Sequence, residues 1–355
     1  MFYFKEKLMK KNKWKLFTVI AATVVVMFSI YGLWKLSNEK ELRTQNESIK
    51  TQVKIELTKS DENIDMTVKE DQAYNYSYVP RSNDGVGTAL VTNNNKTVIQ
   101  TTGFEVGENS NFTSTIAISN LSDEKKEFML VPIIDYKQQH IQLGGEKSNK
   151  LKFSIQPKGI IFIPFSIVNM EEGIHDVIFL VMKDSNRKDL DMDSRKATEL
   201  THILPIRTTA IVGDVKKKKL EYTKLSEMES NAPFEGSIVT KTKKLEPWII
   251  EENLNKDVNY YINVGNQQDL KQDFAVMAFL NGEQIPINDD KNVIMGTLPA
   301  NTMSRIKGKL NKQDVSNGVS NFTTIYVPKP YQGFESELED YVEPTVNVGI
   351  QKQSE

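Results

Sequence analysis

The sequence predicts an all-β protein, in which two tandem β-sandwiches follow one N-terminal transmembrane helix. Three observations support this fold class. Short runs rich in β-branched and aromatic residues recur from residue 97 onward, with turn residues between them and no long helical period. The rhythm of residues 115–135 returns at 261–281. A charge-free stretch of 19 residues precedes both repeats.

The charge-free stretch is LFTVIAATVVVMFSIYGLW, residues 16–34. As a helix it would be roughly 29 Å long, the thickness of the hydrocarbon core of a bilayer. Trp14 and Trp34 bracket it, where indole rings prefer the membrane interface. Six lysines and one glutamate precede it. The positive-inside rule therefore predicts a cytoplasmic N-terminus, with everything after Lys35 outside the cell membrane.

Two other interpretations of this stretch are weaker. A cleaved signal peptide needs small residues at a cleavage site, and no A-x-A-like motif follows the run. A buried helix of a soluble protein would be shorter and would show a polar stripe. We therefore expect an uncleaved single-pass anchor, with the lipid bilayer as the partner of residues 16–34.

Composition narrows the class of protein further. A chain of 355 residues is long enough for about two domains. It has no cysteine, which excludes disulfides, thiolate metal sites and cysteine nucleophiles, and which favours a bacterial envelope over a eukaryotic secreted protein. Residues 36–355 hold 38 basic and 46 acidic residues, a net charge of −8. Because phosphate backbones attract basic surfaces, no nucleic acid is expected as a partner.

The extracytoplasmic part divides by pattern. A polar stalk precedes two alternating segments, 53–57 and 64–68, which predict a β-hairpin with one buried face. Residues 71–96, rich in Asn, Ser, Tyr and Gly, predict a long loop. The predicted order is a cytoplasmic tail (1–15), transmembrane helix (16–34), stalk (35–52), first sandwich with its hairpin and loop (53–214), second sandwich (215–350) and tail (351–355).

The two sandwiches follow one plan. An ungapped alignment of Asn120 with Asn266 also pairs Phe128 with Phe274, Asp135 with Asn281 and Ile141 with Ile287. Further along, with an insertion, it pairs Pro157 with Pro299 and Gly173 with Gly318. Any two sandwiches share some turn chemistry, but agreement over more than twenty positions favours an internal duplication.

The segments SNLSDEKKEF and GNQQDLKQDF, with LNGEQIPI in the second copy, resemble bacterial immunoglobulin-like modules of the CARDB and related cell-adhesion type. The resemblance covers roughly residues 97–214 and 215–350. It implies two tandem immunoglobulin-like sandwiches and a binding or spacer role at the envelope. Such modules have no common active site, so the resemblance assigns no residue a role.

One segment has partial metal-ligand spacing. In DLDMDS, residues 189–194, the carboxylates of Asp189, Asp191 and Asp193 stand at the first three ligand positions of a calcium loop. Ser194 replaces the turn glycine and Leu200 the twelfth-position glutamate, and the flanks are basic. A solvated hairpin loop is therefore favoured, with the three aspartates as weak metal candidates and no cofactor expected.

The remaining candidates have structural interpretations. The histidines form no zinc motif, and Trp248 is expected in a core. The lysine run 216–219 predicts a linker, with anionic wall polymer as the alternative partner. Three alternating tyrosines share one strand face, typical of a core or of a sugar-binding surface, and an acidic run near the C-terminus predicts a charged loop. The histidines are His140, His175 and His202. The alternating tyrosines are Tyr74, Tyr76 and Tyr78, and the acidic run is residues 335–344.

These patterns favour a non-enzymatic, membrane-anchored protein that presents tandem immunoglobulin-like domains to a protein of the envelope or a cell-wall polymer. No phosphate loop or nucleophile elbow is present. Two alternatives stay open. The chain could be an accessory subunit of a membrane complex, held through its anchor helix, or an envelope hydrolase with a site formed only in space.

Overall fold

The computed structural model describes residues 64–65, 85–91, 103–106, 110–184, 203–213, 220–225, 227–288, 291–332 and 341–352. They belong to one compact unit, residues 49–355. Within this described part no helix is long and apolar enough to cross a membrane. The anchor predicted at 16–34, the stalk and the first hairpin strand at 53–57 lie outside the described residues.

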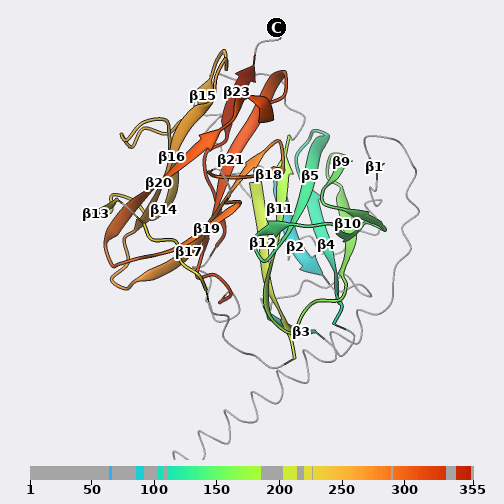
Figure 1. Ribbon diagram of the computed structural model, residues 1–355. Helices are drawn as coiled ribbons and strands as arrows, with labels where there is room; N and C mark the ends of the chain where they lie inside the picture. Colours follow the sequence, from blue (N-terminus) through green and yellow to red (C-terminus); the bar gives the residue numbers. More distant parts are fainter. Residues whose placement is uncertain are drawn as a thin grey trace, which may run out of the picture. The chain divides into compact units, whose positions relative to one another are not determined.

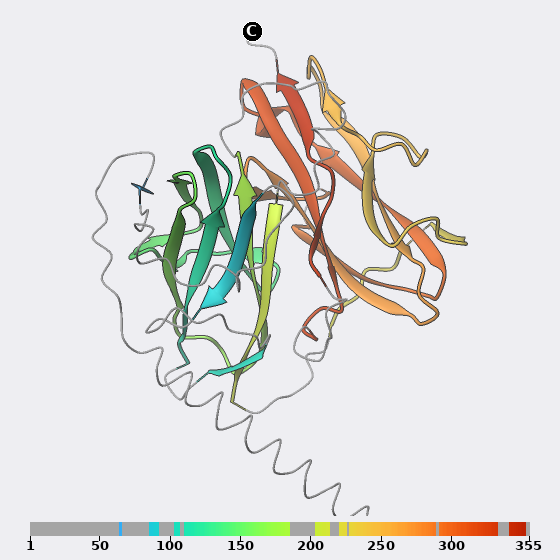
Figure 2. The ribbon, with the colours of Figure 1, turned by 180° about the vertical axis from the view of Figure 1, so that it is seen from behind.

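The strands fall into two groups, coloured blue to yellow-green and gold to red in Figures 1 and 2. We call the first group, β1–β12, module 1. One of its sheets has the order β1-β9-β5-β11-β12-β3, with β6 beside β5, and the other the order β2-β4-β10-β7-β8. The strands are β1 (Ile64–Asp65), β2 (Val86–Val91), β3 (Gly103–Val106), β4 (Phe112–Asn120), β5 (Lys126–Ile134), β6 (Lys137–Gln138), β7 (Ile141–Leu143), β8 (Glu146–Ser148), β9 (Leu151–Ile155), β10 (Ile160–Ile167), β11 (Gly173–Lys183) and β12 (Ile203–Val212).

Module 2 comprises β13–β23. One sheet has the order β13-β20-β16-β14 and the other β15-β23-β21-β17-β18, with β19 beside β17 and β22 beside β21. The strands are β13 (Met228–Ser230), β14 (Gly236–Thr240), β15 (Ile250–Glu251), β16 (Val258–Asn266), β17 (Gln272–Leu280), β18 (Glu283–Ile285), β19 (Val293–Leu298), β20 (Thr302–Leu310), β21 (Gly318–Pro328), β22 (Glu343–Pro344) and β23 (Val348–Lys352), with a 3₁₀ turn, η4 (Lys312–Asp314), between β20 and β21. β23 extends two residues into the segment that the sequence assigned to the tail.

Both modules are immunoglobulin-like β-sandwiches. In module 1, β2, β4, β10 and β7 occupy the places of strands A, B, E and D, and β5, β11 and β12 those of C, F and G. In module 2, β14, β16 and β20 correspond to A, B and E, and β17, β21 and β23 to C, F and G. β3 pairs in parallel with β12, and β15 in parallel with β23, so even this edge feature is repeated.

Each sandwich has its own core. Leucine, isoleucine, valine and phenylalanine side chains from both sheets of module 1 form one cluster, and a second cluster fills module 2. Trp248, expected in a core, is 4% exposed and lies against Tyr260 and Phe322, with ring centroids 6.1 and 5.8 Å away. The β-branched and aromatic content that predicted the strands is what fills these cores.

The repeated pattern extends to single hydrogen bonds, while the internal duplication itself stays a prediction. The buried Asn120 at the end of β4 donates Nδ2 to the carbonyls of Glu124 and Ile155, at 2.7 and 3.0 Å. At the end of β16, Asn266 donates Nδ2 to the carbonyls of Leu270 and Leu298, at 2.9 and 3.3 Å. Each asparagine Oδ1 also accepts the N–H two residues on. Because both turns need this side chain, the same asparagine recurs after 146 residues.

The same contacts correct one part of the predicted alignment. Asn120 Nδ2 reaches the carbonyl of Gln156 at 3.2 Å, and Asn266 Nδ2 reaches that of Pro299 at 2.9 Å. Pro299 is therefore the counterpart of Gln156, and its predicted pairing with Pro157 is wrong by one residue. The two prolines sit at neighbouring positions of one turn, where either position accepts the fixed φ of proline. Gly173 and Gly318 do correspond, since each opens its strand and pairs with the last residues of the following one.

Candidate functional site: the face between the modules

Four strands are buried on both of their faces. In β5, β11, β17 and β21 nearly every residue of the second half is buried, whichever side of the sheet it points to. One side of each strand faces the core of its own module. The other side meets the other module in a shared cluster, here called the intermodule face. Its members include Met129, Val131, Ile133, Leu180 and Met182 from module 1, and Ala275, Met277, Phe279, Ile325 and Val327 from module 2.

Across the intermodule face, equivalent residues of the two modules make reciprocal hydrogen bonds, as in a two-fold symmetric dimer. The N–H of Gln138 donates to Gln284 Oε1 at 2.8 Å, and the N–H of Gln284 donates to Gln138 Oε1 at 2.7 Å. Gln138 Nε2 donates to the carbonyl of Gly282 at 3.0 Å, and Gln284 Nε2 to that of Tyr136 at 2.8 Å. Both glutamines hold equivalent positions in β6 and β18. This reciprocity is the mark of an isologous interface, formed here within one chain.

An ion pair is buried at one end of this face. Asp176 of β11 is fully buried, and the Arg207 side chain of β12 is 8% exposed. Arg207 Nη2 lies 2.9 Å from Asp176 Oδ2, and Nε lies 3.3 Å from Oδ1. The Tyr136 hydroxyl also donates to this carboxylate. A buried charge needs such partners, because its transfer out of water costs several kcal/mol when they are missing, about 3–5 kcal/mol for a broken pair.

The ion pair binds a loop of module 2. Arg207 Nη1 donates to the carbonyl of Pro328 at 2.7 Å, and Nη2 to that of Lys329 at 2.8 Å. The N–H of Tyr331 donates to Asp176 Oδ2 at 2.8 Å. The Tyr331 ring stands edge-on to Tyr136, with centroids 5.3 Å apart. The backbone at the end of β21 is therefore held by both charges of module 1.

A second carboxylate lies beside this pair. Asp135 Oδ2 is 2.7 Å from His175 Nδ1, and His175 Nε2 is 2.9 Å from the carbonyl of Glu171. Both ring nitrogens face acceptors, so the doubly protonated imidazolium satisfies both contacts. Burial, followed by the charges of Asp135 and Asp176, raises the pKa of Tyr331. Burial, followed by Asp176, also raises the pKa of Tyr136. Both phenols therefore stay protonated and act as donors.

Module 2 repeats this arrangement without charges. Asn321 and Asn347 occupy the places of Asp176 and Arg207, and Asn347 Nδ2 donates to Asn321 Oδ1 at 3.1 Å. Ser320 stands where His175 stands, and accepts Asn281 Nδ2 at 3.1 Å. Gly282 replaces Tyr136, and a Cβ there would lie 2.1 Å from Met129 Cε. This end of the face thus receives a methionine of module 1, and the neighbouring Glu283 forms an ion pair with Lys150 of module 1.

The polar groups of this arrangement already have partners within the protein. The carboxylate oxygens of Asp176 are used by Tyr136, Arg207 and the N–H of Tyr331. Both nitrogens of His175 are in contact with acceptors. Within the described residues no group of three or more acidic or histidine side chains is placed to hold a metal ion. These groups hold the two modules together through charge and hydrogen bonds.

The sequence candidates are distributed as follows. His175 belongs to the intermodule face, whereas His140 is exposed near β6. Asp189, Asp191 and Asp193, together with His202, lie outside the described residues, so calcium binding there stays a prediction. The same holds for the three tyrosines, for the lysine run 216–219 and for residues 335–340.

Sequence reasoning missed the intermodule face, although a signal was present. FMLVPII, VIFLVM and FAVMAFL are uninterrupted apolar runs, which are typical of strands covered on both faces. An alternating pattern would have been enough for a sandwich with one face in water. The excess of apolar residues was therefore the mark of a second covered surface.

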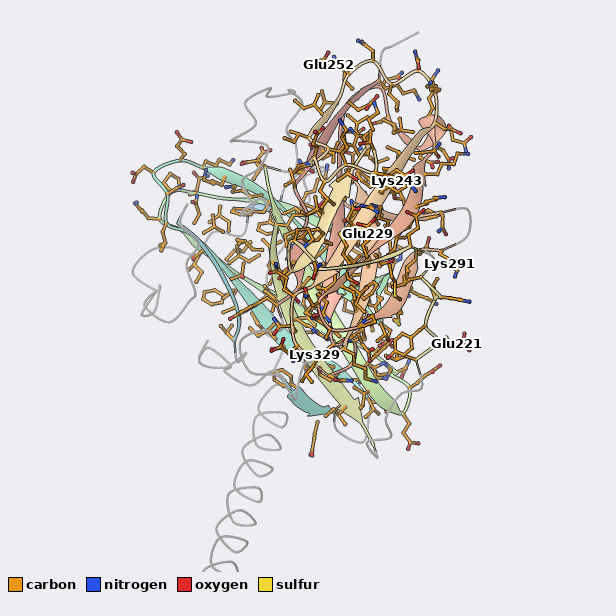
Figure 3. The ribbon with its side chains drawn as sticks, turned by 90° about the vertical axis from the view of Figure 1, so that its left-hand side faces the viewer. Glu221, Glu229, Lys243, Glu252, Lys291 and Lys329 are labelled. Carbon is orange, nitrogen blue, oxygen red and sulfur yellow. The ribbon has the colours of Figure 1, made fainter. Side chains whose placement is uncertain are left out.

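Charged side chains of both signs are spread over the outside of module 2, among them Glu229, Lys243 and Lys291 (Figure 3). Arg305 forms a bidentate pair with Glu229, and Lys243 Nζ lies 3.1 Å from Glu227. The exposed pair of Lys243 and Glu227 is worth about 0–1 kcal/mol. They favour solubility of this surface and say little about stability.

Comparison with known proteins assigns no family. No family model matches the chain, and no curated protein matches it. Among solved structures, the CARDB domain of a Pyrococcus furiosus protein in complex with di-metal ions is similar at 14% identity, covering 37% of this chain and 99% of that one, with a TM-score of 0.25. The C-terminal domain of the AgI/II polypeptide BspA of Streptococcus agalactiae is similar at 9% identity, covering 75% and 99%, with a TM-score of 0.20. Red sea bream transglutaminase matches at 10% identity, covering 69% and 29%, with a TM-score of 0.19.

The first of these structures belongs to the type of module that the sequence resembles, and its domain is about the size of one module. TM-scores this low carry no argument about function. The immunoglobulin-like fold of each module therefore rests on its own strand order.

Proposed function

We propose that this chain is a non-catalytic protein of the bacterial cell surface, anchored in the membrane through residues 16–34, which presents two fused immunoglobulin-like modules to a protein or polymer of the envelope. The main observation behind this proposal is that the buried polar groups of module 1 hold module 2 in place. Asp176, Arg207 and Tyr136 serve to dock module 2. A pair of modules held in this way keeps the loops at its ends in fixed relative positions, which suits binding.

The anchor and the surface charge supply the rest of the proposal. The charge-free stretch and the lysines before it predict that the modules are outside the membrane. The net charge of −8 after Lys35 favours a partner other than nucleic acid or an anionic lipid surface. The intermodule face is used internally, so a partner must bind elsewhere.

The experiment uses the full chain with a C-terminal tag, expressed in the bacterium that carries it. We expect the tag to be found in the membrane fraction. Protease added outside cells whose wall has been removed should cleave it. In intact cells the protein should crosslink to wall polymer or to one envelope protein. Recovery from the cytoplasm, or the absence of any crosslinked partner, would contradict the proposal.

An anchor-swap variant separates a binding module from an accessory subunit. In it, residues 16–34 are replaced by an unrelated transmembrane segment of the same length. If the modules alone bind the partner, the crosslink persists. If the crosslink to a membrane protein is lost while the protein stays in the membrane, the anchor helix itself is the contact, and the accessory-subunit interpretation is favoured.

A further inference from the structure

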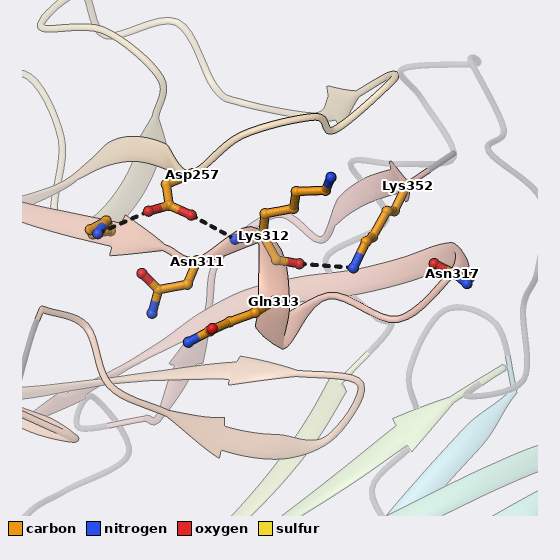
Figure 4. A pocket seen from close by; sticks show the side chains of 7 residues that line it. Asp257, Asn311, Lys312, Gln313, Asn317 and Lys352 are labelled. Atoms are coloured by element: carbon orange, nitrogen blue, oxygen red, sulfur yellow. Dashed lines mark hydrogen bonds and ion pairs between the residues drawn. The ribbon is translucent and has the colours of Figure 1, made fainter. Parts of the chain in front are cut away.

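A polar hollow of about 660 Å³ lies at one end of module 2, within the size range of ligand sites. Segments distant in sequence meet there: the turn before β16, the end of β20, the η4 turn, the loop before β21 and the end of β23 (Figure 4). Its lining is Asp257, Lys309, Asn311, Lys312, Gln313, Asn317 and Lys352.

The lining is basic, although the extracytoplasmic part of the chain is acidic. It holds three lysines and one carboxylate. Asp257 Oδ1 accepts the N–H of Lys312 at 2.9 Å, and Oδ2 lies 3.0 Å from Lys309 Nζ. The backbone N–H of Lys312, followed by the Lys309 ammonium, lowers the pKa of Asp257. The carboxylate is therefore ionised and offsets one lysine, and the hollow keeps a net positive charge.

Lys352 is fixed at the edge of the hollow. Its Nζ donates to the carbonyl of Lys312 at 3.1 Å and to that of Val315 at 2.9 Å. An ammonium has three donors, and these two contacts orient the group. Figure 4 shows Lys352 beside the η4 turn, with Asn317 beyond it. The fold therefore holds the Lys352 ammonium group in one position at the edge of the hollow.

Module 1 shows that the fold does not require this charge. The register of the paired strands makes Ser166, Asn169 and Val212 the counterparts of Lys309, Lys312 and Lys352. The turn itself is preserved, since the N–H of Asn169 donates to Asn111 Oδ1 at 3.1 Å, as the N–H of Lys312 does to Asp257. One scaffold therefore carries three lysines in module 2 and none in module 1.

We propose that this hollow binds an anionic, hydroxyl-rich polymer of the envelope, of the phosphodiester-linked polyol class. Lysine ammonium groups match phosphate charges, and the amides of Gln313 and Asn317 can both donate to and accept from hydroxyls. Asn311 Nδ2 already donates to Asp314 Oδ2 at 3.1 Å. The lining has no aromatic ring on which a base or a sugar face would stack. The proposal rests on the proposed function, because it names the partner class of the same extracytoplasmic modules.

The test measures binding of the full chain, purified in a neutral detergent, to immobilised polyglycerol phosphate, with neutral dextran as the comparison polymer. The test variant is Lys309→Gln with Lys312→Gln. Its backbone contacts to Asp257 and Lys352 are retained, because they involve the main chain of residue 312. The matched control is Lys243→Gln with Lys291→Gln, which removes the same charge from exposed positions of module 2 outside the hollow (Figure 3).

We expect the wild type and the control to bind polyglycerol phosphate and not dextran, with affinity falling as salt is raised. The hollow variant should bind about tenfold more weakly, which is the size expected for two lost charge contacts. Unchanged melting temperatures show that each variant is folded. Equal binding by the hollow variant and the control, or no binding by the wild type, would overturn the proposal.

This result is distinguishable from a failure of the proposed function. If the full chain crosslinks to an envelope partner in cells while the hollow variant crosslinks equally well, the modules bind through another surface and only the hollow is excluded. If no crosslink forms with the wild type, the proposed function itself fails.

Discussion

At the Asp176 end of the intermodule face the two modules make polar contacts at equivalent positions, but only module 1 uses charged side chains to make them. Asp176 and Arg207 of module 1 correspond to Asn321 and Asn347 of module 2, and the polar contact is 2.9 Å in one and 3.1 Å in the other. The charged pair reaches across the intermodule face to the carbonyls of Pro328 and Lys329. The comparison indicates that the fold of each module is satisfied by a neutral polar contact at this position. The charges of Asp176 and Arg207 serve instead to dock the neighbouring module.

The largest effect is expected from breaking the charged pair. Asp176→Ala leaves the Arg207 guanidinium buried without its carboxylate, so the free energy of unfolding should fall by about 3–5 kcal/mol in denaturant titration. The equivalent change in module 2, Asn321→Ala, removes one neutral hydrogen bond and should cost about 1–2 kcal/mol. Equal costs for the two variants would mean that the charge has no special role.

The next effect tests the other end of the intermodule face. In Gly282→Ala the new Cβ would lie 2.1 Å from Met129 Cε, and the residue has a φ of +76°, a conformation that L-residues rarely adopt. We expect a loss of about 1–3 kcal/mol. Adding Met129→Ala should remove the loss caused by the clash with Met129 and leave the loss caused by the positive φ of residue 282. If the double variant loses the sum of the two single losses, the contact with Met129 is not the cause.

The reciprocal glutamines test the internal two-fold pattern. Gln138→Ala and Gln284→Ala should each cost about 1 kcal/mol, because each removes two hydrogen bonds between the modules and one within its own module. In a double-mutant cycle the two changes should couple by at least about 0.5 kcal/mol. Strictly additive costs, or a cost from one side only, would show that the pair does not act as a unit.

The smallest effect concerns an acidic pair that only module 2 has. Burial, followed by the nearby Glu235, raises the pKa of Glu343, and the place of Glu235 is taken in module 1 by Val86. A raised carboxyl pKa means that the folded state binds the proton more tightly, so stability falls as pH rises through 4.5 toward the folded pKa.

Glu343→Gln should remove this fall. Its advantage over the wild type should be absent below the unfolded pKa and should grow as pH rises past 4.5. It should stay small because solvent reaches the partly exposed side chain. Thermal unfolding between pH 3 and 7 measures it. An advantage that is largest at pH 3 would contradict the stated cause.

Local pattern explains which parts of the fold were predictable. Asn120 and Asn266, Phe128 and Phe274, and Asp135 and Asn281 were aligned correctly, because each pair fills the same turn or the same core position. Asp135 and Asn281 even share a left-handed φ of 51° and 52°. The prolines were misaligned by one residue, since a turn tolerates proline at more than one place. His175 was assigned a structural role, but its partner Asp135 lies 40 residues away and no spacing indicates it.

The sequence by itself determined that the described part of this protein is built from β-strands in two copies of one sandwich, because strand periodicity and turn chemistry are local properties of the chain. It also determined the net charge of −8 after Lys35. Only the tertiary structure decided that the two copies pack on each other, that Asp176 and Arg207 bind the end of β21, and that three lysines from three segments surround one hollow. The physical reason is that these contacts join residues up to 155 positions apart, and such pairings are selected by the packing of whole sheets.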